Sequence, residues 1–140
     1  MKFYETLCRD SPVQKDWKVN FGDKYAMNSG IIDLIDDNDI SDDHDYSVIF
    51  HEMRTWLPSQ EQWQEMYCDK KKCCADEFEL AYYCATRNTR SRYYNPDYAH
   101  FGGGEFSILI KTCAFVHKEV YGLTWDWDKN VWVKEWTQHL

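Results

Sequence analysis

The order of apolar and polar residues predicts β-structure in the first third of the chain. Two short apolar runs, 24–27 and 31–35, flank Asn28-Ser29-Gly30, a composition typical of turns, so we expect a β-hairpin there. Residues 46–53 are rich in β-branched and aromatic side chains and predict a further strand. A short strand is also expected at 17–19.

Helices are predicted downstream of this region. Ser59 and Gln62 have the spacing of a capping box, in which each residue satisfies a backbone N–H group at the start of a helix. Trp63, Met66 and Tyr67 then recur at the spacing of one helical face. The pattern therefore predicts a short amphipathic helix after residue 59.

Two more helices and a hairpin follow in the apolar pattern. A second helix is expected to begin near Asp76, and its apolar face consists of Phe78, Ala81, Tyr82 and Ala85. After a long polar and aromatic loop over 86–104, the strongest helical period covers 106–120 and ends at Gly122. Its apolar positions are Phe106, Leu109, Ile110, Cys113, Val116 and Val120. Residues 123–127 and 131–133 predict a C-terminal aromatic hairpin.

These elements predict an α+β fold with N-terminal antiparallel β-hairpins, about three helices and a C-terminal aromatic β-hairpin. At 140 residues, the chain has the length of one domain, and we expect residues 1–140 to form it. The last of the three helices is expected to be the centre of the core.

The composition adds an excess of aromatic side chains. Seven Trp, ten Tyr and seven Phe exceed what a core of this size requires, so some rings are expected at the surface, where they contact a partner. No apolar run reaches the length of a membrane span, and the first ten residues lack the apolar core of a secretory signal. We therefore expect a cytoplasmic protein, with no membrane association and without disulfide bonds.

The formal net charge of −8 is concentrated in one segment. Between Lys24 and Arg54 there are eight acidic residues and no basic one. Within this segment the stretch 36–45 is expected to be a loop, because Asp disfavours helix interiors and strands. It contains six candidate partner-binding residues, which we call the Asp patch: Asp36, Asp37, Asp39, Asp42, Asp43 and Asp45. Such a patch is either a solvated loop that aids solubility or a mimic of phosphates that occupies a cationic groove.

A second candidate surface combines arginine and tyrosine in the 86–104 loop. Its residues are Arg87, Arg90, Arg92, Tyr93 and Tyr94. This composition is typical of a platform for single-stranded nucleic acid and equally of a protein-binding hot spot. A solvated loop that pairs with the Asp patch is the third interpretation. Because a chain of charge −8 repels polyphosphate, direct binding of nucleic acid is disfavoured.

The sequence predicts no catalytic residue, no metal and no cofactor. Cys68, Cys73, Cys74 and Cys84 invite comparison with zinc sites, but their spacing is irregular, whereas structural zinc ligands pair as C-x2–4-C at comparable spacings. Cys84 is also expected within a helix. We therefore interpret these cysteines as thiols without a metal.

One segment carries a family resemblance. Residues 56–66, Trp-Leu-Pro-Ser-Gln-Glu-Gln-Trp-Gln-Glu-Met, resemble a W-L-P-x-Q-[DE]-Q-L-Q-E-M segment in small uncharacterised proteins of phages and prophages of Gram-positive bacteria. Those proteins also tend to have a "GD-Y…GI-L-D" region, matched here by residues 22–25 and 30–35, and a "W-D-x-x-x-W-V" hairpin, matched by 127–133. Trp63 departs from the usual Leu. The resemblance implies a phage origin and no particular chemistry.

Small acidic phage proteins without catalytic residues are often accessory factors that disable a host protein. We therefore expect an inhibitor of a host protein, of an anti-CRISPR or other anti-defence type. The partner would be a nucleic-acid-binding defence effector in the host cytoplasm, contacted by the Asp patch or by the Arg-Tyr loop. The alternative is a nucleic-acid-binding accessory protein that uses the Arg-Tyr loop. An enzyme or metal-dependent module ranks last.

Overall fold

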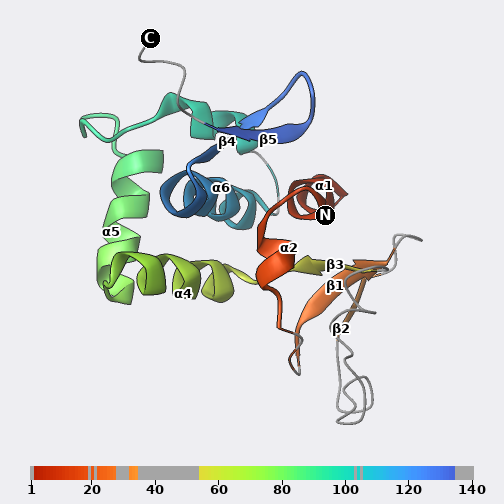
Figure 1. Ribbon diagram of the computed structural model, residues 1–140. Helices are drawn as coiled ribbons and strands as arrows, with labels where there is room; N and C mark the ends of the chain where they lie inside the picture. Colours follow the sequence, from red (N-terminus) through yellow and green to blue (C-terminus); the bar gives the residue numbers. More distant parts are fainter. Residues whose placement is uncertain are drawn as a thin grey trace. The chain divides into compact units, whose positions relative to one another are not determined.

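The computed structural model describes residues 2–18, 20, 22–27, 32–34, 54–102, 104 and 106–134, with 32–34 described by their backbone. The chain forms two compact units, Met1–Pro58 and Ser59–Leu140, which run from red to yellow and from yellow-green to blue in Figure 1. Both helices and antiparallel strands are present, which confirms the α+β class. The prediction of a single domain stays a prediction. No helix in the described ranges is long and apolar enough to cross a bilayer.

The first unit begins with two helices that the sequence analysis did not predict, α1 (Lys2–Arg9) and α2 (Val13–Asp16). Helix α1 is amphipathic, because Tyr4, Leu7 and Cys8 recur at helical spacing and all three are buried. The Tyr4 hydroxyl donates a hydrogen bond to the Pro58 carbonyl oxygen, which joins α1 to the end of the unit.

The sheet of this unit has the order β2-β1-β3, with all neighbours antiparallel. Strands β1 (Lys24–Met27) and β2 (Ile32–Leu34) confirm the predicted hairpin. Strand β3 (Arg54–Leu57) was not predicted as a strand, and the strand expected at 46–53 lies outside the described residues. The predicted strand at 17–19 is wrong for its described residues, because Trp17 and Lys18 lie in no strand.

Side-chain contacts explain the positions of Trp17 and α2. The Trp17 ring stacks on Trp56 at 5.9 Å between centroids, and its indole N–H donates to the Asp23 carboxylate at 2.9 Å. The Gln14 amide bonds both backbone groups of Trp56, accepting from its N–H at 2.8 Å and donating to its C=O at 2.9 Å. The Gln14 side chain therefore satisfies the backbone N–H and C=O groups of Trp56 in β3, as a neighbouring strand would.

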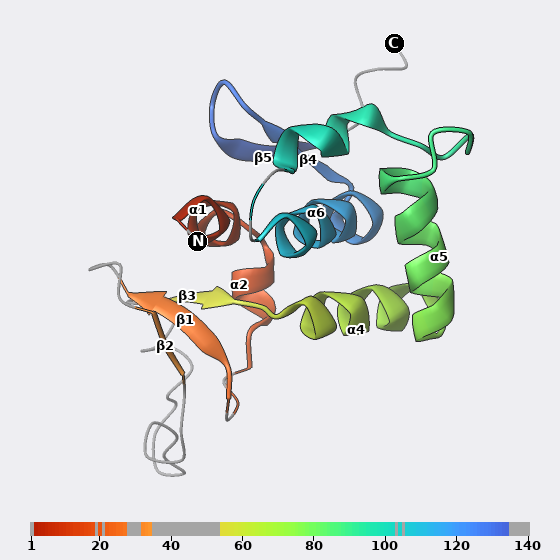
Figure 2. The same ribbon diagram turned by 180° about the vertical axis from the view of Figure 1, so that it is seen from behind.

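The second unit contains the three predicted helices, α4 (Gln60–Lys71), α5 (Ala75–Thr86) and α6 (Ser107–Val116). The capping box is confirmed: the Ser59 hydroxyl accepts from the Gln62 N–H at 3.1 Å, and the Gln62 amide oxygen accepts from the Ser59 N–H at 2.8 Å. In both views α5 stands at the far end of α4 (Figures 1 and 2). Helices α4, α5 and α6 contact one another pairwise.

Part of the segment expected to be a loop is helical. Within 86–104, residues Pro96–Phe101 form the 3-10 helix η1. The Asn95 side chain caps it by accepting from the Asp97 N–H at 2.9 Å, and proline stands at its first position, where no N–H donor is needed. The loop prediction is therefore wrong at η1, because the Asn95 cap and Pro96 stabilise a short helical turn there.

Helix α6 continues as a single π-helical turn, η2 (His117–Tyr121), and ends at Gly122, whose φ of 68° is left-handed as predicted. Strands β4 (Leu123–Asp126) and β5 (Val131–Lys134) then form the predicted aromatic hairpin. In its four-residue connection the Asp126 carboxylate accepts from the N–H groups of Asp128 and Lys129 at 2.9 and 3.0 Å.

The core of the second unit is centred on Phe115. Its ring lies within 5.5 to 6.3 Å of the rings of Tyr67, Phe78, Tyr82 and Tyr98. The buried residues of α6 and η2 are Thr112, Cys113, Ala114, Phe115, Val116 and His117. Of the predicted apolar positions of this helix, Cys113 and Val116 are buried, whereas Leu109 and Ile110 are only half-buried.

Candidate functional site

A groove with a volume of about 810 Å³ lies in the second unit. One wall is α5, and the opposite wall is formed where α6 passes into η2. The residues that follow α5 contribute to its lining. The lining residues are Tyr67, Lys71, Cys73, Glu77, Leu80, Ala81, Cys84, Ala85, Arg92, Tyr93, Tyr94, Asn95, Phe115, Lys118 and Glu119.

Helix α5 presents one face to the groove. Glu77, Leu80, Ala81 and Cys84 recur at the i, i+3, i+4 and i+7 positions of that face. Leu80 is 65% exposed, although the residue is fully apolar. This wall of the groove therefore presents a solvent-exposed apolar side chain.

The segment after α5 holds an arginine and a tyrosine against each other. The Arg92 guanidinium lies 4.9 Å from the centroid of the Tyr93 ring, and its Nη2 donates to the Tyr93 hydroxyl at 2.7 Å. The Asn95 N–H donates to the Ala85 carbonyl at 2.9 Å, which ties the segment to the end of α5. The Arg92–Tyr93 pair is thus arranged before any partner binds, although Tyr93 is 64% exposed.

The predicted Arg-Tyr surface is divided by the structure. Arg92, Tyr93 and Tyr94 line the groove. Arg87 directly follows α5, and Arg90 lies in the turn after it. Both side chains are exposed, and neither lines the groove. The six residues of the Asp patch lie outside the described residues.

Charges of both signs line the groove. Lys71 and Glu119 approach each other at 3.8 Å, and both are substantially exposed, so the pair contributes little to stability. Arg92 and Lys118 are further cations, and Glu77 is a further carboxylate. Burial raises the pKa of Tyr67, and the nearby Glu119 carboxylate raises it further. Mixed charge fits a protein segment better than a polyphosphate.

The cysteine cluster is spread over α4, α5 and the turn between them. Burial, with a hydrogen bond to the Cys73 thiol as the next cause, raises the pKa of the Cys68 thiol to about 11. The exposed Cys74 thiol instead lies 3.6 Å from a Glu77 carboxylate oxygen. All six cysteines are free thiols. Over the described part of the chain, no three His, Cys, Asp or Glu side chains are placed to hold a metal ion.

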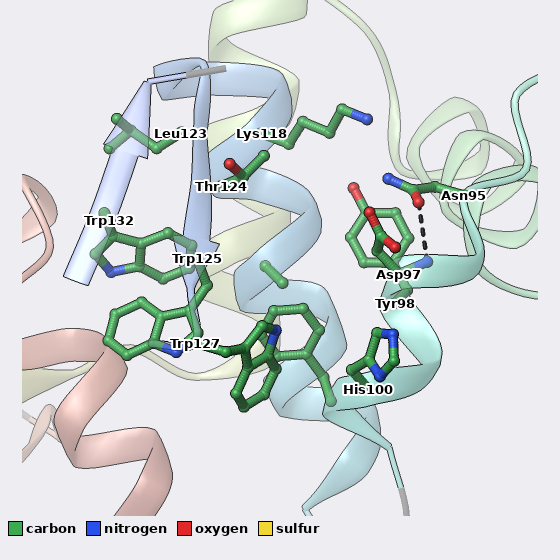
Figure 3. Close-up of a pocket in the computed structure, with 12 residues that line it drawn as sticks. Asn95, Asp97, Tyr98, His100, Lys118, Leu123, Thr124, Trp125, Trp127 and Trp132 are labelled. Atoms are coloured by element: carbon green, nitrogen blue, oxygen red, sulfur yellow. Dashed lines mark hydrogen bonds between the residues drawn. The ribbon is translucent and has the colours of Figure 1, made fainter. Parts of the chain in front are cut away.

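A second hollow, of about 370 Å³, lies between η1 and the β4–β5 hairpin (Figure 3). We call it the indole pocket, because Trp125, Trp127 and Trp132 line it. Trp125 and Trp132 face each other across the hairpin, with ring centroids 5.1 Å apart. The sequence analysis predicted this hairpin but did not predict a pocket beside it.

Comparison with known proteins does not assign the chain. No family model, no curated protein and no solved structure matches it. The resemblance to small phage proteins therefore stays a prediction, and the site must be interpreted from its own chemistry.

Arg92, Tyr93 and Tyr94 of the groove were predicted from the sequence, whereas Leu80 on its α5 wall was not. Leu80 lies on α5 opposite to the face assigned to the core, where an apolar residue is unexpected. That misplaced leucine was the available signal for a binding surface.

Proposed function

We propose that the protein acts by binding another protein, and that the groove beside α5 is the contact surface. The observation that carries this proposal is the exposed apolar wall next to a prearranged Arg-Tyr pair. Leu80 and Tyr93 are 65% and 64% exposed and both line the groove. Covering them removes apolar area from water, which favours association.

The residues at the groove are of the kind that dominates binding energy. Tyrosine and arginine are enriched among the few interface residues whose loss weakens binding strongly. Because Arg92 and Tyr93 already contact each other at 2.7 Å, little side-chain entropy remains to be lost on binding. The pair therefore suits a hot spot better than two independently moving side chains would.

The lining also indicates the chemistry of the partner. Ala81, Ala85 and Phe115 form an apolar floor that accepts an aliphatic or aromatic side chain. The Arg92 guanidinium, which also lines the groove, can donate two parallel hydrogen bonds to a carboxylate. The proposed ligand is a segment of a host protein in which an apolar residue lies close to an acidic one.

In this proposal the protein is a phage-encoded accessory factor that inhibits a host protein in the host cytoplasm, and it is not an enzyme. Its resemblance to small phage proteins supports the origin, and the local concentration of acidic residues supports a target that normally binds nucleic acid. The Asp patch, residues Asp36 to Asp45, would supply a second contact by mimicking phosphates. A phage protein that blocks a nucleic-acid-binding host protein would have an anti-CRISPR or other anti-defence role.

The experiment is affinity capture from host lysate with matched variants. Arg92→Ala and Tyr93→Ala remove side chains that line the groove, whereas Arg90→Ala and Tyr83→Ala remove exposed side chains of the same types that do not line it. We expect one host protein to be captured by wild type and by the two controls, and lost with the two groove variants. Each hot-spot change should weaken binding by about 2 kcal/mol or more.

Two outcomes would overturn the proposal. Equal capture by groove and control variants would place the contact elsewhere. Tight binding of wild type to single-stranded nucleic acid at physiological salt, lost with Arg90→Ala or Tyr93→Ala, would favour the alternative nucleic-acid-binding function.

A further inference from the structure

The indole pocket is lined mainly by η1 and the β4–β5 hairpin, and it shares Asn95 and Lys118 with the groove. Its volume of about 370 Å³ lies at the small end of the range for small-molecule sites, roughly 300–1,000 Å³. Small-molecule sites combine aromatic walls with a few convergent polar groups. Figure 3 shows the three indoles on the hairpin side, Asn95 and Asp97 on the η1 side, and the Lys118 side chain beside Thr124, extending towards Asn95.

The aromatic side offers a ring for stacking. Trp127 is 44% exposed, and the Phe101 ring supports it at 5.0 Å between centroids. His100 is exposed beside it and lines the same pocket. Planar heteroaromatic rings stack on such side chains without requiring a particular hydrogen-bond pattern. Trp125 and Trp132 are more deeply placed and complete the aromatic wall.

The polar side offers three groups of distinct type. The Asn95 amide oxygen is engaged by the Asp97 N–H at 2.9 Å, so its amide nitrogen remains as a donor at the pocket wall. Asp97 supplies an exposed carboxylate, which accepts hydrogen bonds from hydroxyl groups. Lys118 supplies an ammonium, which binds phosphate as a point charge.

We propose that the indole pocket binds a mononucleotide, with the base stacked on Trp127, the ribose hydroxyls at Asp97 and the phosphate at Lys118. A carboxylate that binds ribose hydroxyls is a common device in nucleotide sites. An organic cation could contact the Asp97 carboxylate but would make no favourable contact with the Lys118 ammonium. A neutral sugar would make no use of that ammonium. A nucleotide uses all three kinds of group in the order in which the pocket presents them.

The test is calorimetric titration of the full-length protein with AMP and GMP, and separately with adenosine, guanosine and ribose 5-phosphate. We expect at least one mononucleotide to bind with a Kd below about 1 mM and to quench tryptophan fluorescence. Its nucleoside and ribose 5-phosphate should each bind more weakly. Absence of binding by both nucleotides, or equal binding of a nucleoside and its nucleotide, would overturn the proposal.

Variants separate the two halves of the pocket. Trp127→Ala should weaken nucleotide binding about 5- to 140-fold, the range for loss of one base stack, whereas Tyr83→Ala, an exposed aromatic residue outside the pocket, should not. Lys118→Met should weaken nucleotide binding about tenfold or more and leave nucleoside binding unchanged, with Lys70→Met as the control. Equal effects of Trp127→Ala and Tyr83→Ala, with circular dichroism unchanged, would refute the assignment.

Discussion

His117 makes the stability of the second unit depend on pH in a predictable way. Its side chain is fully buried, and it stacks on Trp132 at 3.8 Å with the ring planes 1° apart. The ring nitrogen Nδ1 lies 2.7 Å from the Cys113 carbonyl oxygen. A carbonyl only accepts, so Nδ1 carries a hydrogen, and in the neutral ring Nε2 is therefore the unprotonated nitrogen. Burial lowers the pKa of His117 from 6.5 to about 4.

The sign and size of the effect follow from this shift. In the unfolded chain His117 binds a proton below pH 6.5, whereas in the folded chain it resists protonation until about pH 4. The neutral burial of His117 therefore stabilises the fold fully above pH 6.5, and this contribution is lost as pH falls towards 4. With 1.36 kcal/mol for each pKa unit, the loss is about 2 kcal/mol between pH 7 and 5 and about 3 kcal/mol by pH 4.

The assay is a series of urea melts, followed by tryptophan fluorescence, for wild type and His117→Gln between pH 7 and pH 4. Glutamine does not titrate, so the variant should be less stable at pH 7, and its deficit should shrink by about 3 kcal/mol at pH 4. Carboxylates titrate equally in both proteins and cancel in the difference. Parallel stability curves for the two proteins would show that His117 titrates alike in the folded and unfolded chains, and would refute the reasoning.

Two further predictions concern packing and thiol chemistry in the second unit. Phe115→Ala should lower the free energy of unfolding by about 3–5 kcal/mol, because it leaves a cavity at the centre of the ring cluster. Ile108→Ala changes a side chain on the same helix that is 45% exposed, so it should lower the free energy of unfolding far less. Equal losses in denaturant melts would contradict this placement of the core. Iodoacetamide at pH 8 should alkylate the exposed Cys74 well before Cys68, whose pKa of about 11 keeps it protonated; peptide mass spectrometry would contradict this if Cys68 reacted first.

Local signals in the sequence were sufficient for most elements. The capping box at Ser59 and Gln62 was readable because its two hydrogen bonds join residues three apart. The end of the helix at Gly122 was predictable because only glycine adopts a left-handed φ of 68° at no steric cost. The β1–β2 and β4–β5 hairpins were likewise predictable, because each joins two apolar runs that are close together in the sequence.

Non-local packing was not readable in the same way. Gln14 bonds Trp56 across 42 positions, and nothing in the local pattern indicates that a glutamine completes the edge of β3. The stripe assigned to α6 was right at Cys113 and Val116, which are buried, but it left out Phe115, whose ring meets the rings of other elements. The site was found in part for the same reason: Arg92 and Tyr93 are neighbours in sequence, whereas Leu80 joins them only through folding.

The most direct test of the proposed function is a titration of the captured host protein with purified variants. Two variant sets are compared with wild type: Arg92→Ala with Tyr93→Ala, and the Asp patch changed to Asn at Asp36, Asp37, Asp39, Asp42 and Asp43. The groove pair should weaken binding chiefly by faster dissociation, and the Asp-patch set chiefly by slower, less salt-dependent association. If the protein partner bound the groove pair as tightly as wild type, with Arg90→Ala and Tyr83→Ala as controls, the groove would not be the contact surface.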